Sequence, residues 1–189
     1  MMPYSFANEI ACQKNDTRKH KTKMNIKLVK AESRSDIASL AELAREIWRQ
    51  HFTPIIGASQ VEYMLEKFQS VEAITSQLEN GAEYYIACLA NEPVGYTGLV
   101  PDVANKKMMI NKIYLRNSCR GIGIGGYMLN FVEQECKKRK LGKIWLTVNR
   151  FNHGAIEWYS RKGFETVNEV KQDIGNGFFM DDYIMEKRI

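Results

Sequence analysis

Short runs of apolar residues, each bounded by glycine, proline or asparagine, predict the strands of a β-sheet along most of the chain. The run at 144–148 is continuous rather than alternating, which is typical of a central strand that is covered on both faces. Turn residues at 91–93 and 175–177 join neighbouring runs and predict two hairpins. The predicted strands are 26–29, 84–90, 94–99, 108–115, 144–148, 164–170 and 178–185.

The segments between these runs carry apolar residues at every third or fourth position, which is the period of an amphipathic helix. The longest has its apolar positions between Ile37 and Trp48, so we expect a helix that begins at Ser35 or Asp36. It should end before Pro54, because the residue before a proline is pushed out of the α region. The order of these elements indicates an α/β (α+β) domain with a mixed sheet of six to seven strands. The other predicted helices lie at 61–68, 71–78, 124–140 (stopped by Gly142) and 152–163.

Residues 1–23 differ from the rest of the chain, because they are polar, show neither period and include a basic run at 18–23. They contain no apolar stretch long enough for a secretory signal. We expect a flexible, dispensable N-terminal extension at residues 1–23, followed by one domain at residues 24–189.

The composition and charge are those of an ordinary globular protein. With 27 Lys and Arg against 22 Asp and Glu, the formal net charge is +5, which suits polyphosphate ligands as well as nucleic acid. No run approaches the ~18 apolar residues that a membrane span needs. The four cysteines and three histidines show no pairing or metal-binding spacing. We expect a reduced, cytoplasmic protein that binds no metal, membrane or nucleic acid.

A glycine-rich loop follows the predicted strand at 108–115 and opens directly into the next helix. Four glycines fall between Gly121 and Gly126, and they remove Cβ atoms where the backbone N–H groups of a helix start are free. Such a turn can hold a phosphate with main-chain donors and the positive end of the helix dipole. Arg120 at its edge can add a charge-assisted contact, so the loop is a candidate anion site.

Two kinds of nucleotide-binding fold match this loop only in part. Gly121-x-Gly123-x-x-Gly126 satisfies the dinucleotide fingerprint literally. That fingerprint also needs an acidic residue at the end of the next strand, where this chain has Asn149 and Arg150. A P-loop needs Lys-Ser or Lys-Thr after its last glycine, where this chain has a tyrosine and a methionine.

Two segments of the chain together resemble the GNAT N-acetyltransferases. Arg120-x-x-Gly123-x-Gly125, after the apolar strand, is similar to the acetyl-CoA signature of that family. The segment 152–164 is similar to its second half, in which an asparagine starts a helix, a tyrosine follows seven residues later and Gly-Phe opens the next strand. The resemblance covers roughly residues 25–189, and around 46–68 the chain is also similar to the branch of PaiA-type polyamine acetyltransferases.

The resemblance implies a GNAT fold, with helices on both faces of the sheet and a splayed strand pair that holds acetyl-CoA. The pyrophosphate of the co-substrate would lie on the N–H groups of the glycine loop. Its pantetheine arm would bond like an added strand to the main chain of Ile113 and Leu115. The implied acetyl-CoA-binding residues are Ile113, Tyr114, Leu115, Arg120, Gly121, Ile122, Gly123, Ile124, Gly125, Gly126, Asn152, Ala155 and Arg161.

The resemblance also implies that Tyr159 donates a proton to the departing CoA thiolate, because a phenol with a pKa near 10 is protonated at neutral pH. Local sequence places Asn152 at the start of the same helix, where we expect its side chain to cap the helix. Many relatives carry a glutamate as the base on the strand before the loop, but this chain has Met109 and Asn111 at the candidate positions. The proton would then pass through a water chain or to another carboxylate, for which the candidates are Glu83, Asp181 and Asp182.

The implied function is that of an acyltransferase, which moves the acetyl group of acetyl-CoA to a primary amine by direct attack. The sequence leaves the acceptor open between a polyamine, another small amine and a protein amine. A GNAT-fold module that binds acyl-CoA without turnover is one alternative, which the missing strand glutamate favours. A dinucleotide-binding oxidoreductase is a second, which only the literal fingerprint favours. Aromatic residues in the closing strands are compatible with a homodimer.

Overall fold

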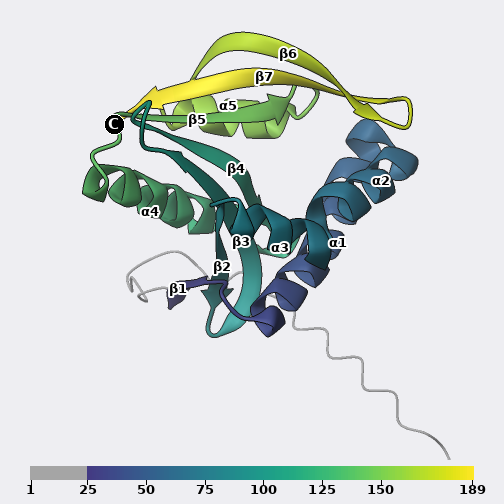
Figure 1. Ribbon diagram of the computed structural model, residues 1–189, viewed down its shortest axis with the longest axis horizontal. Helices are drawn as coiled ribbons and strands as arrows, with labels where there is room; N and C mark the ends of the chain where they lie inside the picture. Colours follow the sequence, from purple (N-terminus) through teal and green to yellow (C-terminus); the bar gives the residue numbers. More distant parts are fainter. Residues whose placement is uncertain (1–24) are drawn as a thin grey trace, which may run out of the picture.

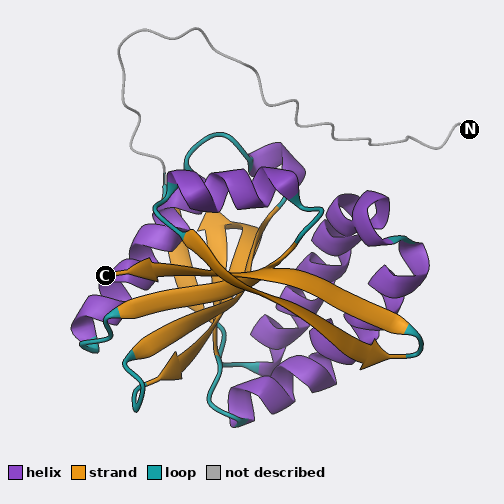
Figure 2. Ribbon diagram, turned by 90° about the horizontal axis from the view of Figure 1, so that it is seen from above, coloured by secondary structure: helices purple, strands orange, loops and turns teal. Residues whose placement is uncertain are grey.

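The computed structural model describes residues 25–189, so the extension expected at residues 1–23 lies outside the described residues. The described chain folds as one mixed sheet flanked by helices (Figures 1 and 2). In order, its elements are β1 (Ile26–Lys30), α1 (Arg34–Ile56), α2 (Ala58–Gln69), α3 (Val71–Glu79), β2 (Glu83–Leu89), β3 (Glu92–Asp102), β4 (Lys107–Leu115), a 3₁₀ turn (Asn117–Cys119), α4 (Ile124–Lys138), β5 (Lys143–Asn149), α5 (His153–Arg161), β6 (Glu165–Gly175) and β7 (Phe178–Arg188).

The sheet contains seven strands in the order β1-β2-β3-β4-β5-β7-β6. Every neighbouring pair is antiparallel except β4 and β5, which run parallel at the centre of the sheet. The predicted fold class and the predicted number of strands are therefore confirmed. The strand at 144–148, predicted to be central, is β5 and lies between β4 and β7.

Helices cover both faces of the sheet, as expected. One buried cluster joins α1, α2 and α3 to one face, and a second joins α4 and α5 to the other. Strand β2 shows how the period of two divides its side chains between these clusters. Tyr84 and Ile86 pack with α1–α3, while Tyr85 packs with α4 and α5.

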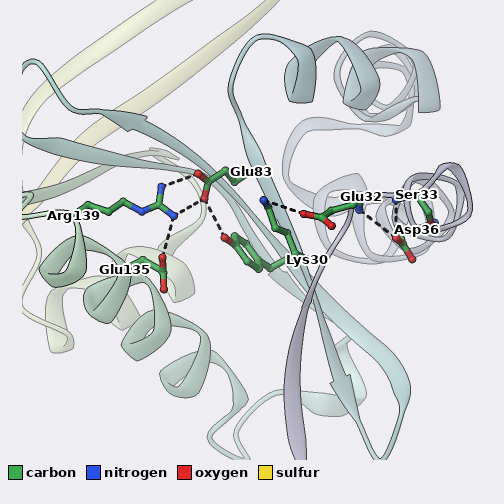
Figure 3. Close-up of polar contacts among 8 residues, drawn as sticks. Lys30, Glu32, Ser33, Asp36, Glu83, Glu135 and Arg139 are labelled. Carbon is green, nitrogen blue, oxygen red and sulfur yellow. Dashed lines mark hydrogen bonds and ion pairs between the residues drawn. The ribbon is translucent and has the colours of Figure 1, made fainter.

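Helix α1 begins earlier than predicted, because Ser33 is its N-cap rather than Ser35 or Asp36. The Asp36 N–H donates to the Ser33 hydroxyl over 3.1 Å, and the Ser33 N–H donates to the Asp36 carboxylate over 2.9 Å (Figure 3). This reciprocal capping box satisfies two of the free N–H groups at the helix start. Asp36 is therefore a residue of the first turn whose carboxylate accepts from the N-cap N–H, and it is not the N-cap itself.

The predicted end of α1 before Pro54 is wrong, since the helix continues through the proline to Ile56. A proline inside a helix removes one backbone hydrogen bond. Here the last turn is retained by two compensations: Ile55 and Ile56 pack against the core, and the Gly57 N–H donates to the Thr53 carbonyl over 3.0 Å. Gly57, at φ +81°, then ends the helix.

The other elements match the predicted ones with different ends. Helix α4 ends at Lys138, and Lys140 rather than Gly142 takes the left-handed conformation that redirects the chain, at φ +56°. Strands β6 and β7 extend well beyond the predicted lengths, because they pair with each other along a long hairpin in which β6 is largely exposed and β7 is mostly half-buried. The tip of that hairpin lies beside α2 (Figure 1).

The parallel pairing of β4 and β5 stops after three residue pairs, the last being Met109 with Trp145. Beyond it, β4 stays paired with β3 as far as Leu115, and β5 stays paired with β7 as far as Asn149. The two halves of the sheet therefore diverge (Figure 1). This splay, which the family resemblance implied, leaves one edge of β4 without a strand partner.

A buried network of hydrogen bonds holds α1 and α2 on the sheet. The indole N–H of Trp48 donates to the Tyr96 hydroxyl over 3.1 Å, and that hydroxyl donates to the Gln69 side-chain oxygen over 3.2 Å. Tyr96 is fully buried on β3. Each buried polar group in this chain of contacts has a partner, as buried polar groups require.

We expect Tyr96→Phe to lower the free energy of unfolding by about 1–3 kcal/mol, because the Trp48 N–H and the Gln69 oxygen lose their common partner in a dry interior. Tyr127→Phe on the exposed surface of α4, where the side chain is 44% exposed, is the matched control and should change stability by less than ~0.5 kcal/mol. Urea denaturation of both variants measures the difference. Equal stabilities would show that the network contributes nothing net.

Candidate active site

A large cavity of about 1420 Å³ lies at the splay. It runs from the glycine loop and α5, past the free edge of β4, to α1–α3 and the β6–β7 hairpin. Pockets for one drug-sized ligand usually measure roughly 300–1,000 Å³. This cavity therefore has room for a long ligand together with a second, smaller molecule.

The glycine loop has the backbone conformation that an anion cradle needs. Gly121 and Gly123 have φ angles of +79° and +100°, which side chains other than glycine rarely adopt. Gly123 is the N-cap of α4, and among residues 25–189 no side chain caps the first N–H groups of that helix. These donors, at the positive end of the helix dipole, are available to a phosphate.

Two further glycines of the loop allow close packing around the cavity. A Cβ atom on Gly125 would lie 3.2 Å from the Trp158 ring, so the glycine lets α4 approach α5. A Cβ on Gly126 would lie 3.6 Å from the Lys162 Nζ. The loop therefore brings a basic side chain of the α5 end close to the start of α4.

The cavity gathers all but two of the residues that the family resemblance assigned to acetyl-CoA. The two outside it are Ile122, whose side chain is exposed, and Ile124, whose side chain is buried in the core with Met128. The side chains of these two residues do not line the cavity, so only their backbone N–H groups remain as proposed contacts to acetyl-CoA. The predicted residues that line the cavity are Ile113, Tyr114, Leu115, Arg120, Gly121, Gly123, Gly125, Gly126, Asn152, Ala155 and Arg161.

Arg120 is anchored by a residue that sequence reasoning missed. Its guanidinium lies 3.1 Å from the Nδ1 of His51 on α1, and its Nε donates to the Leu115 carbonyl over 3.3 Å. Burial lowers the pKa of His51 below 6.5, and the charge of Arg120 lowers it further. The neutral ring can therefore accept the hydrogen bond. His51 has no motif around it, and only the packing of α1 brings it here.

The prediction that the Asn152 side chain caps α5 is wrong. Asn152 occupies the N-cap position, but its side chain makes no hydrogen bond to the helix. It is buried and lines the cavity beside His51, where its hydrogen bond partly opposes the lowering of the His51 pKa by burial and Arg120. The amide is therefore turned away from the helix and towards the site.

Tyr159 on α5 lines the cavity and is only 8% exposed. Its ring is fixed between Trp158 and Phe164 at centroid distances of 5.1 and 5.5 Å. Burial raises the pKa of the phenol well above 10, so Tyr159 is protonated at neutral pH. Its hydroxyl forms no hydrogen bond with another residue in the described part of the chain, which leaves the proton available to a ligand.

Only one of the three candidate carboxylates lines the cavity. Glu83 is held by Arg139 of α4 through two contacts of 2.7 and 2.8 Å, away from the splay (Figure 3). Asp181 lies 2.7 Å from the Nε of Arg150 and is outside the cavity. Asp182, on the opposite side of β7, faces inward.

Asp182 is 5% exposed, and burial raises its pKa from 3.8 to about 6, against an opposing hydrogen bond from Thr147. It is therefore mainly ionised at neutral pH. The pKa of Tyr114 is raised first by burial and then by the proximity of both Tyr159 and Asp182. These three side chains, from β4, α5 and β7, thus gather in one part of the cavity.

A β-bulge in β4 determines which side chains face the part of the cavity next to α3. Gly98 and Leu99 of β3 pair with Lys112 and Ile110, so Asn111 is an extra residue in β4. Ile110 packs towards α4 and α5, whereas Lys112 contacts Gln77 of α3. Bulges re-aim side chains in this way and are common beside active sites. Lys112 lines the cavity, and sequence reasoning gave it no role.

Residues 25–189 contain no cluster of three or more His, Cys, Asp or Glu side chains that is arranged to bind a metal. Within the same residues, no helix is long and apolar enough to span a bilayer.

Comparison with known proteins identifies the family. The sequence model of the acetyltransferase (GNAT) family matches residues 39–164, which is more than half of the chain. The chain belongs to the GNAT family of acetyltransferases. It is accordingly an acyltransferase whose co-substrate is acetyl-CoA.

Individual relatives of this acetyltransferase are distant. An uncharacterized N-acetyltransferase of Lactobacillus delbrueckii subsp. lactis is 23% identical over 171 residues, covering 87% of this chain and 98% of the relative. A spermidine N(1)-acetyltransferase of Thermoplasma acidophilum is 25% identical over 158 residues, covering 81% and 91%. The fold is similar to that of a PaiA N-acetyltransferase of Thermoplasma acidophilum solved in complex with coenzyme A, with a TM-score of 0.70, 24% identity and coverage of 88% and 100%.

The geometry of this acetyltransferase fits acetyl-CoA. The main chain of β4 from Ile110 to Leu115 lacks a β5 partner, as required for a pantetheine arm that bonds like an added strand. The uncapped start of α4 and the side chains of Arg120, Arg161 and Lys162 lie along the same cavity and suit the phosphates.

Replacing Gly123 by valine should weaken acetyl-CoA binding at least ~100-fold, because the side chain strains the φ of +100° and covers the N–H groups of the cradle. Gly81→Val is the matched control, since Gly81 has a similar φ of +89° but lies outside the cavity. Both variants should lose similar stability, and only the first should lose affinity in calorimetric titration. Equal affinities would remove the loop from the binding site.

Proposed function

We propose that the chain acetylates a primary amine by direct attack, with Asp182 as the proton acceptor and Tyr159 as the proton donor. One observation carries the proposal: both side chains line one cavity at the splay, and burial gives them opposite protonation states at neutral pH. A buried carboxylate with a pKa of about 6 is a suitable base at neutral pH. A phenol with a raised pKa remains a proton donor.

Acetyl-CoA supplies the acetyl thioester, whose sulfur leaves as a thiolate when the amine nitrogen bonds to the carbonyl carbon. The chain's own residues hold and move the protons. An alkylammonium, with a pKa near 10.4, has no free electron pair, so Asp182 takes one of its protons before attack. Tyr159 gives its proton to the departing sulfur, and after attack the nitrogen loses a second proton, which restores the phenol of Tyr159 by way of solvent. Asp182 then releases its proton to solvent, so each turnover frees one proton.

The missing strand glutamate does not favour a non-catalytic module once Asp182 is considered. Met109 and Asn111 of β4 carry no carboxylate, but β7, which pairs with β5 and so lies across the splay from β4, supplies one. Thr147 of β5 donates a hydrogen bond that fixes the orientation of the carboxylate. A dinucleotide-dependent oxidoreductase is not favoured either, because the glycine loop belongs to an acetyltransferase family.

We expect Tyr159→Phe to lower kcat at least ~10-fold while leaving the affinity for acetyl-CoA nearly unchanged, because only the transferable proton is lost. Tyr85→Phe is the matched control: Tyr85 is also 8% exposed but lies outside the cavity, and its removal should leave kcat unchanged. Steady-state thiol release measures kcat, and calorimetry measures affinity. An unaltered kcat in Tyr159→Phe would exclude the phenol as the acid.

Asp182→Asn should lower kcat by about 10²–10⁴, the range typical of a lost general base. In the parent protein kcat should fall as the pH drops below about 6, because Asp182 is then protonated, and this acid limb should disappear in the variant. The neighbouring Asp181→Asn, which alters a carboxylate outside the cavity, should keep both kcat and the limb.

Thermal unfolding separates catalysis from damage to the fold. Burial raises the pKa of Asp182, so its ionised form destabilises the folded state at pH values above about 6. Asp182→Asn should therefore melt at the same or a higher temperature at pH 7.5, whereas a structural role would lower it. An acid limb that persists in this variant would exclude Asp182 as the base.

A further inference from the structure

Lys112 is a buried cation in the cavity of this acetyltransferase. Its side chain is 5% exposed and extends from β4 towards α3, on the face to which the Asn111 bulge turns it. The ammonium donates to the Gln77 side-chain oxygen over 2.8 Å and to the Asn111 side-chain oxygen over 3.2 Å. It also lies 5.4 Å from the centroid of the Tyr84 ring.

All of these contacts are neutral. Gln77 is itself fixed, because its amide nitrogen donates to the carbonyls of Phe68 and Ala73 and its oxygen also accepts from the Tyr84 hydroxyl. No carboxylate of the described chain lies within 4.0 Å of Lys112. Burial of such a charge is costly unless an opposite charge meets it, and burial lowers the pKa of Lys112 to about 8.

The same cavity contains one buried anion. Within residues 25–189, Asp182 is the only acidic residue among the side chains that line it, and it lies on a different strand from Lys112. The two buried charges enter from opposite sides of the splay, Lys112 from β4 and Asp182 from β7. The cavity therefore presents a buried cation and a buried anion, held apart, to a ligand that lies between them.

We propose that the acceptor is an amine that also carries a carboxylate, with its amino group towards Asp182 and its carboxylate paired with Lys112. This inference rests on the proposed amine acetylation and specifies its substrate class. A carboxylate would supply the missing partner of the Lys112 ammonium, and charge-assisted hydrogen bonds of this kind are the stronger ones. The Lys112 ammonium carries one positive charge, and both of its hydrogen-bond acceptors are neutral, so a group with one negative charge matches it.

A polyamine fits the same arrangement poorly. Its second ammonium would lie beside the buried Lys112, where like charges repel. One carboxylate, Asp182, is too few for a polycation, since it is already assigned to the amino group that reacts. A relative that acts on spermidine, according to its name, therefore does not define the acceptor of this chain.

The test compares amines that differ only in the chemical group at the end opposite the reacting amino group. For each chain length, the parent protein is assayed by thiol release with an ω-amino carboxylate, the corresponding alkylamine and the corresponding diamine, with spermidine alongside. The carboxylate series should have a kcat/KM at least ~10-fold above that of the diamines, because a hydrogen bond to a charged group distinguishes them. A parent protein that prefers diamines or spermidine overturns the inference.

Lys112→Met keeps the volume of the side chain and removes its charge. It should lower kcat/KM for the carboxylate series at least ~10-fold, mainly through KM, and leave the alkylamines unchanged. Lys138→Met on the exposed surface of α4 is the control and should leave all three series unchanged. An equal fall in kcat for every amine would overturn the inference, because Lys112 would then act on the chemistry rather than on the far end of the acceptor.

A binding experiment separates failure of this inference from failure of the proposed function. The unreactive pentanoate is added with CoA, and the melting temperature is measured in the parent protein and in Lys112→Met. If pentanoate raises the melting temperature of the parent protein but not that of Lys112→Met, the carboxylate site is supported even when no amine is acetylated. In that case the proposed function alone fails. No protection in the parent protein overturns the site.

Discussion

The early end of the β4–β5 ladder is the constraint on which the site depends. Parallel strands normally continue their hydrogen bonds, and unpaired backbone groups inside a protein destabilise it. Here the pairing ends at Met109 and Trp145 because each strand is held by its other neighbour, β4 by β3 and β5 by β7. The free edge of β4 is thus a permanent main-chain surface for a ligand, and the fold itself supplies it.

The other elements of the site lie around the opening between β4 and β5. The glycine loop and α5 cover one end, and Gly125 lets the two helices approach each other across Trp158. At the other end, the hairpin of β6 and β7 reaches α2, where Lys67 donates to the Ile174 carbonyl over 2.6 Å and Gln60 to the Phe179 carbonyl over 2.8 Å. These contacts join segments that are more than a hundred residues apart in the sequence.

That separation explains what sequence reasoning can and cannot provide. The succession of strands and helices along the chain, the glycine loop and the helix of Tyr159 follow from local periods and spacings. Asp182 is one of two adjacent acids, and only the pairing of β7 with β5 turns it inward. The role of His51 depends on the packing of α1. The orientation of Lys112 depends on a one-residue bulge, and shifting the register by one residue moves every later side chain to the other face.

The energetics of the two buried charges connect stability to function. Burial raises the pKa of Asp182 and lowers that of Lys112, so at neutral pH the charged form of each destabilises the folded state. Moving the two side chains together would remove this cost, yet β4 and β7 hold them apart. A ligand that brings both opposite charges would bind only the folded protein and would therefore stabilise it by mass action. Two opposite charges held apart in this way favour a zwitterion, because neither a diamine nor a simple alkylamine can pair with both.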